Sequence, residues 1–251
     1  MNRYRGILFD MHGVLVDLKA LYPQYAQVEA RMLQAKFGGA EERWLEAYKR
    51  NMNWWNTLWL KGEFKGEDGV ERMWQVSWQM VKATLDFLEL SVGAEDKEWI
   101  LHQLPYEAGR HCQVCYPEVS PCLSSLATGE FLMSVTSLAM SSYNRGLLEG
   151  SSIAGYFSHI FGPDIIGLGH KGKEYYRRAF AQVGLEAREC VILDDNIEGI
   201  QAAKSLGALA VLVDREGTEV LPDKEKARSL ADLILPDLRS LPSKLGLGES
   251  L

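Results

Sequence analysis

ILFDMHGVLVD, residues 7–17, is the stretch of this 251-residue chain that decides its fold. Apolar residues lead into Asp10, a glycine, Gly13, follows three positions later, and a second carboxylate, Asp17, closes the stretch. A short apolar run predicts a buried strand, and the glycine predicts a turn directly after it. We therefore predict a strand that delivers the Asp10 carboxylate to a loop, in which the imidazole of His12 lies two residues further along.

The carboxyl half of the chain alternates short apolar runs with stretches of helical period. The apolar runs are EFLMSV (130–135), ECVIL (189–193) and ALAVLV (208–213). Helical patterns follow or precede them, and the helix before the last run is predicted to end at Gly207. Strands and helices that alternate in this way form parallel sheets joined by crossovers. We therefore expect a doubly wound parallel α/β sheet with its ligand sites at the carboxyl ends of the strands.

Residues 18–115 have a different character. They contain all seven tryptophans and show helical spacing without a convincing strand. The prolines of QVCYPEVSP (113–121) mark the return to the alternating pattern. We therefore predict an all-helical domain at 18–115, inserted into an α/β core domain that consists of residues 1–17 and 116–251.

The tryptophans of this helical part allow two interpretations. Pairs at helical spacing, such as Trp55 and Trp59 or Trp74 and Trp78, are predicted mostly to fill the interior of the helical domain. The alternative is an aromatic wall that faces a substrate, with Lys61 as the anchor for a substrate anion.

Composition and charge exclude several classes of function. The net charge is −7, whereas nucleic-acid binding requires a clustered basic surface. No apolar run approaches the roughly 20 residues of a membrane span, and the amino end leads into a strand without room for a signal peptide. We expect a cytoplasmic protein without nucleic-acid or membrane partners. Cys112 and Cys115 supply too few ligands for a closed zinc site and are interpreted as reduced structural thiols.

Polar residues follow the predicted strands at the point where each strand ends. They are Asp10, then Thr136 with Ser137, then Asp194 with Asp195. In a parallel sheet these positions meet at one edge, where three carboxylates repel one another unless a cation shares them. Mg²⁺ suits such a set of oxygens and leaves room for a phosphate. The hydroxyl of Thr136 and the ammonium of Lys171 are candidates to bind that phosphate.

Each of these features is common when it occurs alone, because an aspartate at a strand end is usually a helix cap or a turn former. Their joint occurrence resembles the haloacid dehalogenase superfamily of hydrolases, in the branch whose helical cap follows the first strand. Four motifs carry the resemblance: FDMHGVLVD (9–17), SVTS (134–137), the lysine of GHKGKEYYRRAF (169–180), and VILDDNIEGIQAAKSLGA (191–208). They span nearly the whole chain and imply a Rossmann-like core with an inserted helical cap.

The resemblance implies a role for each matching residue. Asp10 would attack phosphorus and form an aspartyl phosphate, which divides hydrolysis into two easier displacements. The ligands of Mg²⁺ would be Asp10, the backbone carbonyl of His12, Asp194 and Asp195. The phosphoryl group would be held by Gly13, Thr136, Ser137 and Lys171, with Lys173 as an alternative lysine. Asp17 would be structural.

His12 departs from the family pattern, in which phosphatases usually have an acid/base aspartate two residues past the nucleophile. Three interpretations follow. The imidazole can perform the proton transfers itself, which makes the protein a Mg²⁺-dependent phosphatase of a small organic phosphate. The site can run a related reaction, as the dehalogenases and phosphonatases of the family do, although those dehalogenases lack the acidic pair found at 194–195. The protein can also be a catalytically impaired member that binds a phosphorylated ligand or a protein partner.

Overall fold

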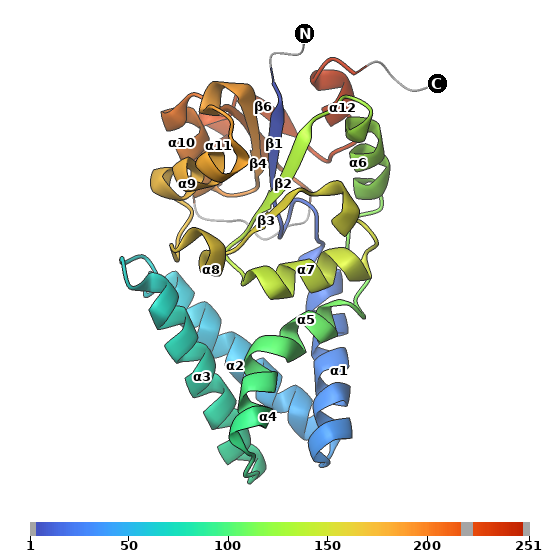
Figure 1. Ribbon diagram of the computed structural model, residues 1–251, viewed down its shortest axis with the longest axis vertical. Helices are drawn as coiled ribbons and strands as arrows, with labels where there is room; N and C mark the ends of the chain where they lie inside the picture. Colours follow the sequence, from blue (N-terminus) through green and yellow to red (C-terminus); the bar gives the residue numbers. More distant parts are fainter. Residues whose placement is uncertain (1–3, 217–222, 248–251) are drawn as a thin grey trace.

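The computed structural model describes residues 4–216 and 223–247. Within them, six parallel strands form one sheet in the order β3-β2-β1-β4-β5-β6 (Figure 1). The strands are β1 (Gly6–Asp10), β2 (Leu132–Thr136), β3 (His159–Phe161), β4 (Cys190–Asp194), β5 (Leu209–Val213) and β6 (Leu233–Leu235). The predicted doubly wound parallel sheet is confirmed.

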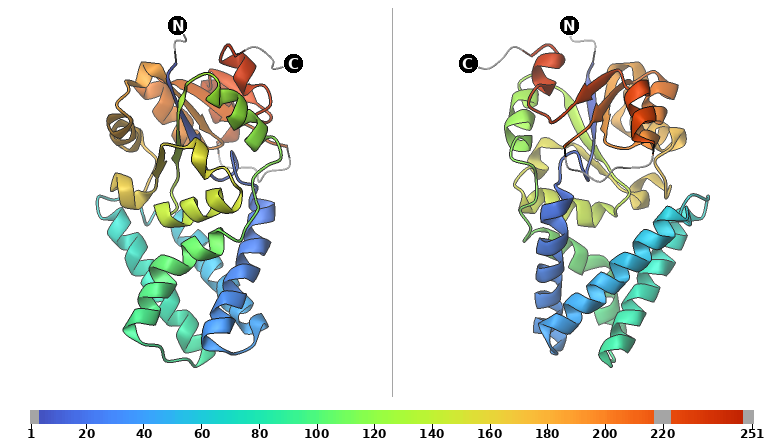
Figure 2. Two further views of the ribbon diagram at one scale, coloured as in Figure 1. Left: turned by 45° about the vertical axis from the view of Figure 1, so that its right-hand side comes forward. Right: turned by 180° about the vertical axis from the view of Figure 1, so that it is seen from behind.

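Helices cover both faces of the sheet (Figures 1 and 2). One face carries α6 (Val119–Ala127), α7 (Ser141–Gly150) and α12 (Leu241–Lys244), and the other carries α9 (Lys173–Val183), α10 (Ile197–Leu206) and α11 (Lys224–Leu230). The short α8 (Pro163–Ile166) follows β3. The helix α10 ends at Gly207, in the left-handed region at φ 83°, as the sequence predicts.

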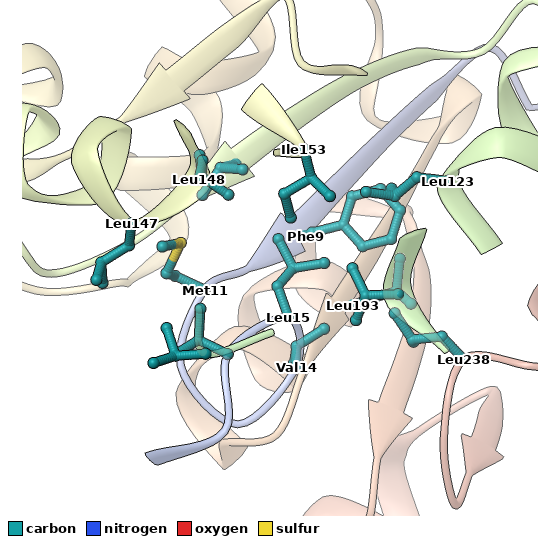
Figure 3. Close-up of a cluster of buried hydrophobic side chains, with 14 of the residues drawn as sticks. Phe9, Met11, Val14, Leu15, Leu123, Leu147, Leu148, Ile153, Leu193 and Leu238 are labelled. Atoms are coloured by element: carbon teal, nitrogen blue, oxygen red, sulfur yellow. The ribbon is translucent and has the colours of Figure 1, made fainter. Parts of the chain in front are cut away.

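The side chains of β1 alternate between two buried clusters. Ile7 and Phe9 belong to the cluster on the side of α6, and Leu8 belongs to the cluster on the side of α9 and α10. Figure 3 shows the first cluster, where Phe9 packs with Leu123 and Leu193. A strand that is buried on both faces needs apolar residues at every position, which explains the unbroken apolar run before Asp10.

The register of the sheet brings the polar strand ends level with one another. Asp10 pairs with Thr136 across the β1–β2 ladder, and Phe9 pairs with Leu193 across the β1–β4 ladder. Asp10 follows Phe9 and Asp194 follows Leu193, so both aspartates lie at the same edge of the sheet as Thr136. β1 and β4 are the two middle strands of the six, so their carboxyl ends lie at the centre of this edge.

A set of helices, which we call the helical insert, lies at the carboxyl ends of the strands (Figures 1 and 2). It consists of α1 (Leu18–Phe37), α2 (Glu41–Leu60), α3 (Gly69–Leu88), α4 (Ala94–Glu98), a π-helical segment (Trp99–Gln103) and α5 (Leu104–Gly109). The Asp17 side chain accepts a hydrogen bond of 2.9 Å from the backbone N–H of Lys19 and so caps α1. Asp17 thus has a structural role, as expected, whereas the division of the chain into core and cap domains stays a prediction.

The helical insert has a small core of its own. Phe64, Met73, Val76 and Met80 are buried there, and Trp55 and Trp59 pack against them. The rings of Trp55 and Phe64 stack with a centroid distance of 4.9 Å. This confirms the packing interpretation for these two tryptophans, while Trp78, at 39% exposure, lies on the surface beside Lys97.

The two crossings of the chain between sheet and insert lie side by side. The backbone N–H of Asp17 donates to the carbonyl of Val114 at 2.8 Å, and that of Tyr116 donates to the carbonyl of Leu15 at 3.1 Å. The returning segment, residues 113–118, therefore packs against the chain that leaves β1. In the part of the chain that the structure covers, no helix combines the length and the apolar character of a membrane span.

Candidate active site

The chain turns sharply after β1, in a segment that we call the nucleophile loop (residues 11–16). The N–H groups of Leu15 and Val16 both donate to the carbonyl of Met11, at 3.0 and 2.9 Å. Gly13 has a φ of 78°, in the left-handed region that favours glycine. A Cβ at this position would lie 2.1 Å from Oδ2 of Asp195. Glycine is thus required twice, for the turn and for the approach of a carboxylate.

Three carboxylates gather beside this loop. One oxygen from each of Asp10, Asp194 and Asp195 lies within 4.8 Å of the others. Asp10 and Asp194 are buried, with 7% and 1% exposure, and Asp195 is half-buried. The expected convergence of the ends of β1 and β4 is therefore observed, and the roles of the three carboxylates stay predictions.

Lys171 lies between two of these carboxylates. Its Nζ contacts Oδ1 of Asp10 and lies 2.8 Å from Oδ2 of Asp194. Burial lowers the pKa of Lys171, but the charges of Asp10 and Asp194 outweigh that effect and hold the pKa well above its usual value. Lys173, the alternative lysine, is exposed at the start of α9. Of the two lysines, Lys171 is the one that reaches the site.

Asp194 is held from several directions. Its Oδ2 also accepts a hydrogen bond of 3.0 Å from the hydroxyl of Tyr176, and its Oδ1 accepts one of 2.9 Å from the N–H of Asn196. A Cβ on Gly199 would lie 2.0 Å from that Oδ2, so the first turn of α10 leaves room for the carboxylate. The sequence did not indicate this role of Tyr176, because helical periodicity does not report where a hydroxyl points.

The three carboxylates at this edge have only Lys171 as a positive partner among the residues described above. Burial raises the pKa of Asp10 to about 7 against the opposing effect of Lys171, and the charge of Asp194 adds to the rise. Burial, followed by the charge of Asp10, raises the pKa of Asp195 well above its usual range. With all three carboxylates ionised, one ammonium would leave an excess of negative charge, which a divalent cation would offset. Carboxylate oxygens at this spacing fit Mg²⁺, and Asp10 and Asp195 have the oxygens least engaged by neighbours.

Comparison with known proteins agrees with this arrangement. The family model of the haloacid dehalogenase-like hydrolases matches residues 4–207. The protein belongs to this family. The resemblance of the four sequence motifs is thereby confirmed.

Solved structures with the same fold include proteins of different activity. YfnB from Bacillus subtilis, solved with bound magnesium, has 16% identity and a TM-score of 0.64, with coverage of 97% of this chain and 99% of that one. A haloacid dehalogenase-like phosphatase from Thermococcus onnurineus has 20% identity and a TM-score of 0.58, with coverage of 97% and 98%. The L-2-haloacid dehalogenase of Xanthobacter autotrophicus has 18% identity and a TM-score of 0.58, with coverage of 98% and 100%. At these identities the likeness shows the fold alone.

His12 of this hydrolase lies in the nucleophile loop, and its ring is 6.2 Å from the ring of Tyr143 on α7. Burial, and then the positive charge of Lys171, lowers the pKa of His12 to about 4. The imidazole is therefore neutral at physiological pH in the metal-free protein. The direction of this shift was not derivable from the sequence, because it depends on how deeply the ring is buried.

Thr136, the last residue of β2, and Ser137, the residue after it, already have protein partners. The Thr136 hydroxyl donates to the carbonyl of Phe9 at 3.3 Å, and the Ser137 Oγ accepts from the N–H of Ala139 at 3.1 Å. The hydroxyl of Tyr175 donates to the carbonyl of Ser137 at 2.9 Å and accepts from its N–H at 3.2 Å. Tyr175, which the sequence did not single out, thus fixes the start of this loop. The phosphate-binding roles of Thr136 and Ser137 stay predictions.

The cysteine pair near the returning segment is reduced. Cys112 is buried and Cys115 is half-buried, and both thiols are free. Burial raises the pKa of each thiol to about 11. Protonated thiols of this kind are poor metal ligands and poor nucleophiles, in agreement with the structural interpretation.

Proposed function

We propose that this hydrolase is a Mg²⁺-dependent phosphatase of a small organic phosphate and that it acts through an aspartyl phosphate at Asp10. The observation that carries the proposal is the convergence of Asp10, Asp194 and Asp195 around Lys171 at the centre of the sheet edge. Such a site has an oxygen nucleophile, a fixed cation and ligands for a divalent metal. These are the parts that phosphoryl transfer needs.

The reaction consists of two displacements. An Oδ of Asp10 attacks phosphorus, the bond between phosphorus and the ester oxygen breaks, and the electron pair leaves with that oxygen. Water then attacks the phosphorus of the aspartyl phosphate, releases inorganic phosphate and returns the Asp10 carboxylate. Lys171 reduces the repulsion between Asp10 and the incoming anion. His12 would move the protons of the leaving alcohol and of the water, and the negative charge of a bound phosphate would favour the imidazolium that the first transfer needs.

Mg²⁺, when bound, would neutralise charge on the phosphoryl oxygens and fix their orientation. Asp10, Asp195 and the backbone carbonyl of His12 would hold it directly, and Asp194 would stand beside them. Magnesium in the structure of YfnB, which has this fold, supports that choice of metal. The engagement of Asp194 by Lys171, Tyr176 and Asn196 is the reason to place it second.

A phosphoryl substrate is favoured over an alkyl halide by the acidic pair at 194–195. Haloalkyl hydrolysis at an aspartate needs no divalent cation, so it gives no reason to bury three carboxylates together. The solved neighbours include both dehalogenases and phosphatases and therefore do not decide between the two chemistries. The carboxylate cluster supports the phosphatase.

The proposal is tested by turnover of a panel of small phosphate esters, with Mg²⁺ and after its removal by a chelator. We expect phosphate release only with the metal, and we expect the Asp10→Asn variant to lose activity by more than about a thousandfold. An Asp17→Asn variant is the matched control, because Asp17 caps α1 and lies outside the site. Release of halide from 2-haloacids without metal, in the absence of phosphatase activity, would favour the dehalogenase.

His12 decides between the active and the impaired phosphatase. Esters with poor leaving groups, such as sugar phosphates, need a proton donor, whereas p-nitrophenyl phosphate does not. If His12 moves the proton, His12→Ala loses the sugar phosphates and keeps p-nitrophenyl phosphate. If the wild type is inactive on every ester and His12→Asp gains large activity, the protein is instead an impaired member that binds a phosphorylated ligand.

A further inference from the structure

A buried arginine from outside the four motifs contacts the nucleophile loop. Arg215 lies two residues beyond β5 and is only 7% exposed. Its Nε donates to the carbonyl of Gly13 at 3.0 Å, and its Nη2 donates to the carbonyl of Val14 at 2.8 Å. These partners are more than 200 residues away along the chain. The guanidinium thus holds two consecutive peptide groups of the loop that follows Asp10.

The other side of the same guanidinium contacts the returning segment. Nη1 of Arg215 lies 2.7 Å from Oε1 of Glu118, which is itself buried, and the guanidinium lies 3.5 Å from the centre of the Tyr116 ring. The contact with the ring combines stacking with a cation–π attraction. Arg215 therefore ties the nucleophile loop to the segment through which the chain returns from the helical insert.

The partners of Arg215 offset the cost of burying its charge. A buried guanidinium is costly unless carboxylates and carbonyls satisfy its N–H groups. Its sequence neighbour Asp214 pairs with Lys224 and Arg228, so Arg215 is not needed to balance that charge. The planar fork of an arginine spreads five N–H donors over three nitrogens and so bridges two carbonyls and a carboxylate in a fixed geometry, whereas the three donors of a lysine radiate from one nitrogen.

The geometry of the loop explains what the contact achieves. Gly13 is in the left-handed region, and its missing side chain leaves the space that Oδ2 of Asp195 fills. A rotation about the backbone torsions of Gly13 would therefore change both the direction of the His12 carbonyl relative to the Gly13 carbonyl and the room for Asp195. With the carbonyls of Gly13 and Val14 fixed by Arg215, that rotation is opposed.

We propose that Arg215 is a positioning residue that holds the nucleophile loop in the conformation required for phosphoryl transfer. The proposal rests on the phosphatase function for its effect on rate, but its effect on the loop can be measured without turnover. Arg215 acts through the loop backbone and through Glu118, and it contributes no atom to the reaction.

The first test is hydrogen exchange of the metal-free protein, resolved to single amides. We expect Arg215→Ala and Arg215→Lys to accelerate exchange of the amides of Gly13, Leu15 and Val16, whose hydrogen bonds close the loop. The amides of residues 7–9 in β1 are the internal reference and keep their protection. Arg239→Ala, which removes an exposed arginine paired with Asp237, is the matched control. Loop amides that exchange at the wild-type rate in both variants, or β1 amides that accelerate equally in Arg215→Lys, would overturn the proposal.

The second test is kinetic. We expect kcat of Arg215→Ala to fall roughly 10- to 100-fold with little change in KM, since a small misplacement of reacting groups has costs of this size. Millimolar guanidinium should restore part of the lost rate in Arg215→Ala. It should leave the rate of Arg239→Ala, the control variant, unchanged. Faster loop exchange with an unchanged kcat would make Arg215 merely structural and refute the positioning role. A wild type that turns over no phosphate ester refutes the phosphatase proposal instead, while the exchange experiment still reports on the loop.

Discussion

The sheet edge and the helical insert each bury a carboxyl group whose pKa is raised to about 7. Burial is the main cause for Asp10 at the sheet edge and for Glu29 on α1 of the insert. At the sheet edge the ammonium of Lys171 opposes the rise, whereas in the insert a hydrogen bond with Tyr25 opposes it. The two regions thus reach similar values by different means.

The surroundings of Glu29 are aromatic. The rings of Tyr25 and Tyr48 are 6.1 Å apart, and those of Tyr25 and Tyr143 are 5.1 Å apart. Burial, together with the charge of Glu29, raises the pKa of all three hydroxyls. This cluster joins α1, α2 and α7 and packs the insert against the core. A raised carboxyl pKa alone therefore does not mark a catalytic site. The sheet edge differs in that strand ends bring several carboxylates close to an ammonium, and glycines beside them leave room for the carboxylates.

The largest change in the free energy of unfolding is expected at the sheet edge, when Lys171 is replaced by Met. This change leaves Asp10 and Asp194 buried without their shared ammonium, and the loss of one partner of a buried ion pair typically costs about 3–5 kcal/mol. Urea unfolding with a chelator at pH 8 should show a decrease of that size in the free energy of unfolding. Lys173→Met, at an exposed position two residues away, should change it little. Equal effects of the two substitutions would contradict the electrostatic description of the edge.

An intermediate effect is expected for Glu29→Gln, as a function of pH. Because the folded-state pKa is raised from 4.5 to about 7, the folded protein keeps a proton there that the unfolded chain loses. The contribution of Glu29 to stability therefore falls as the pH rises from about 4.5 to 7, and above that range its charge is a net cost. Glu29→Gln should remove this dependence and stabilise the protein at pH 8 by on the order of 1 kcal/mol. Unfolding measured at pH 5 and pH 8 checks this, with exposed Glu46→Gln as the control.

The smallest effect is expected where the insert touches the first turn of α10. The Nζ of Lys65 lies 2.7 Å from Oε1 of Glu198 on α10, and both side chains are more than a third exposed. Such pairs typically contribute about 0.2–1 kcal/mol. A double-mutant cycle with Lys65→Met and Glu198→Gln should give a coupling energy in that range that disappears at high salt. A salt-independent coupling of several kcal/mol would show that the Lys65–Glu198 pair is as strong as the buried ion pairs of Lys171, and would contradict this prediction.

The sequence was informative about the fold wherever the elements are long or strongly apolar. β1, β2, β4 and β5 were predicted within one or two residues, and so was the end of α10 at Gly207. β3 and β6 were not, because three residues such as HIF and LIL carry no readable period. Their positions at the two edges of the sheet follow from tertiary pairing alone.

For the site, the motifs predicted which residues meet but not how each is held. Asp10, Asp194 and Asp195 were predicted to converge, since each follows a predicted strand, and Lys171 was a candidate cation for the same edge. Nothing in the sequence pointed to Arg215, because one arginine after a strand is common and its targets are backbone carbonyls more than 200 residues earlier. The room that Gly13 and Gly199 leave for the carboxylates of Asp195 and Asp194 became visible only in the structure.

The central position of β1 has a consequence for how the protein is made. β1 leaves the ribosome before either of its neighbours, and Asp10 is separated from Lys171 by 161 residues. At typical synthesis rates of about 5–20 residues per second, that interval lasts on the order of 10 s. The helices of the insert, whose contacts are local, can form during the wait. A nascent chain can therefore form the helices at this edge before the carboxylates and Lys171 have met, and Asp10 receives its counter-charge only after a further 161 residues have been made.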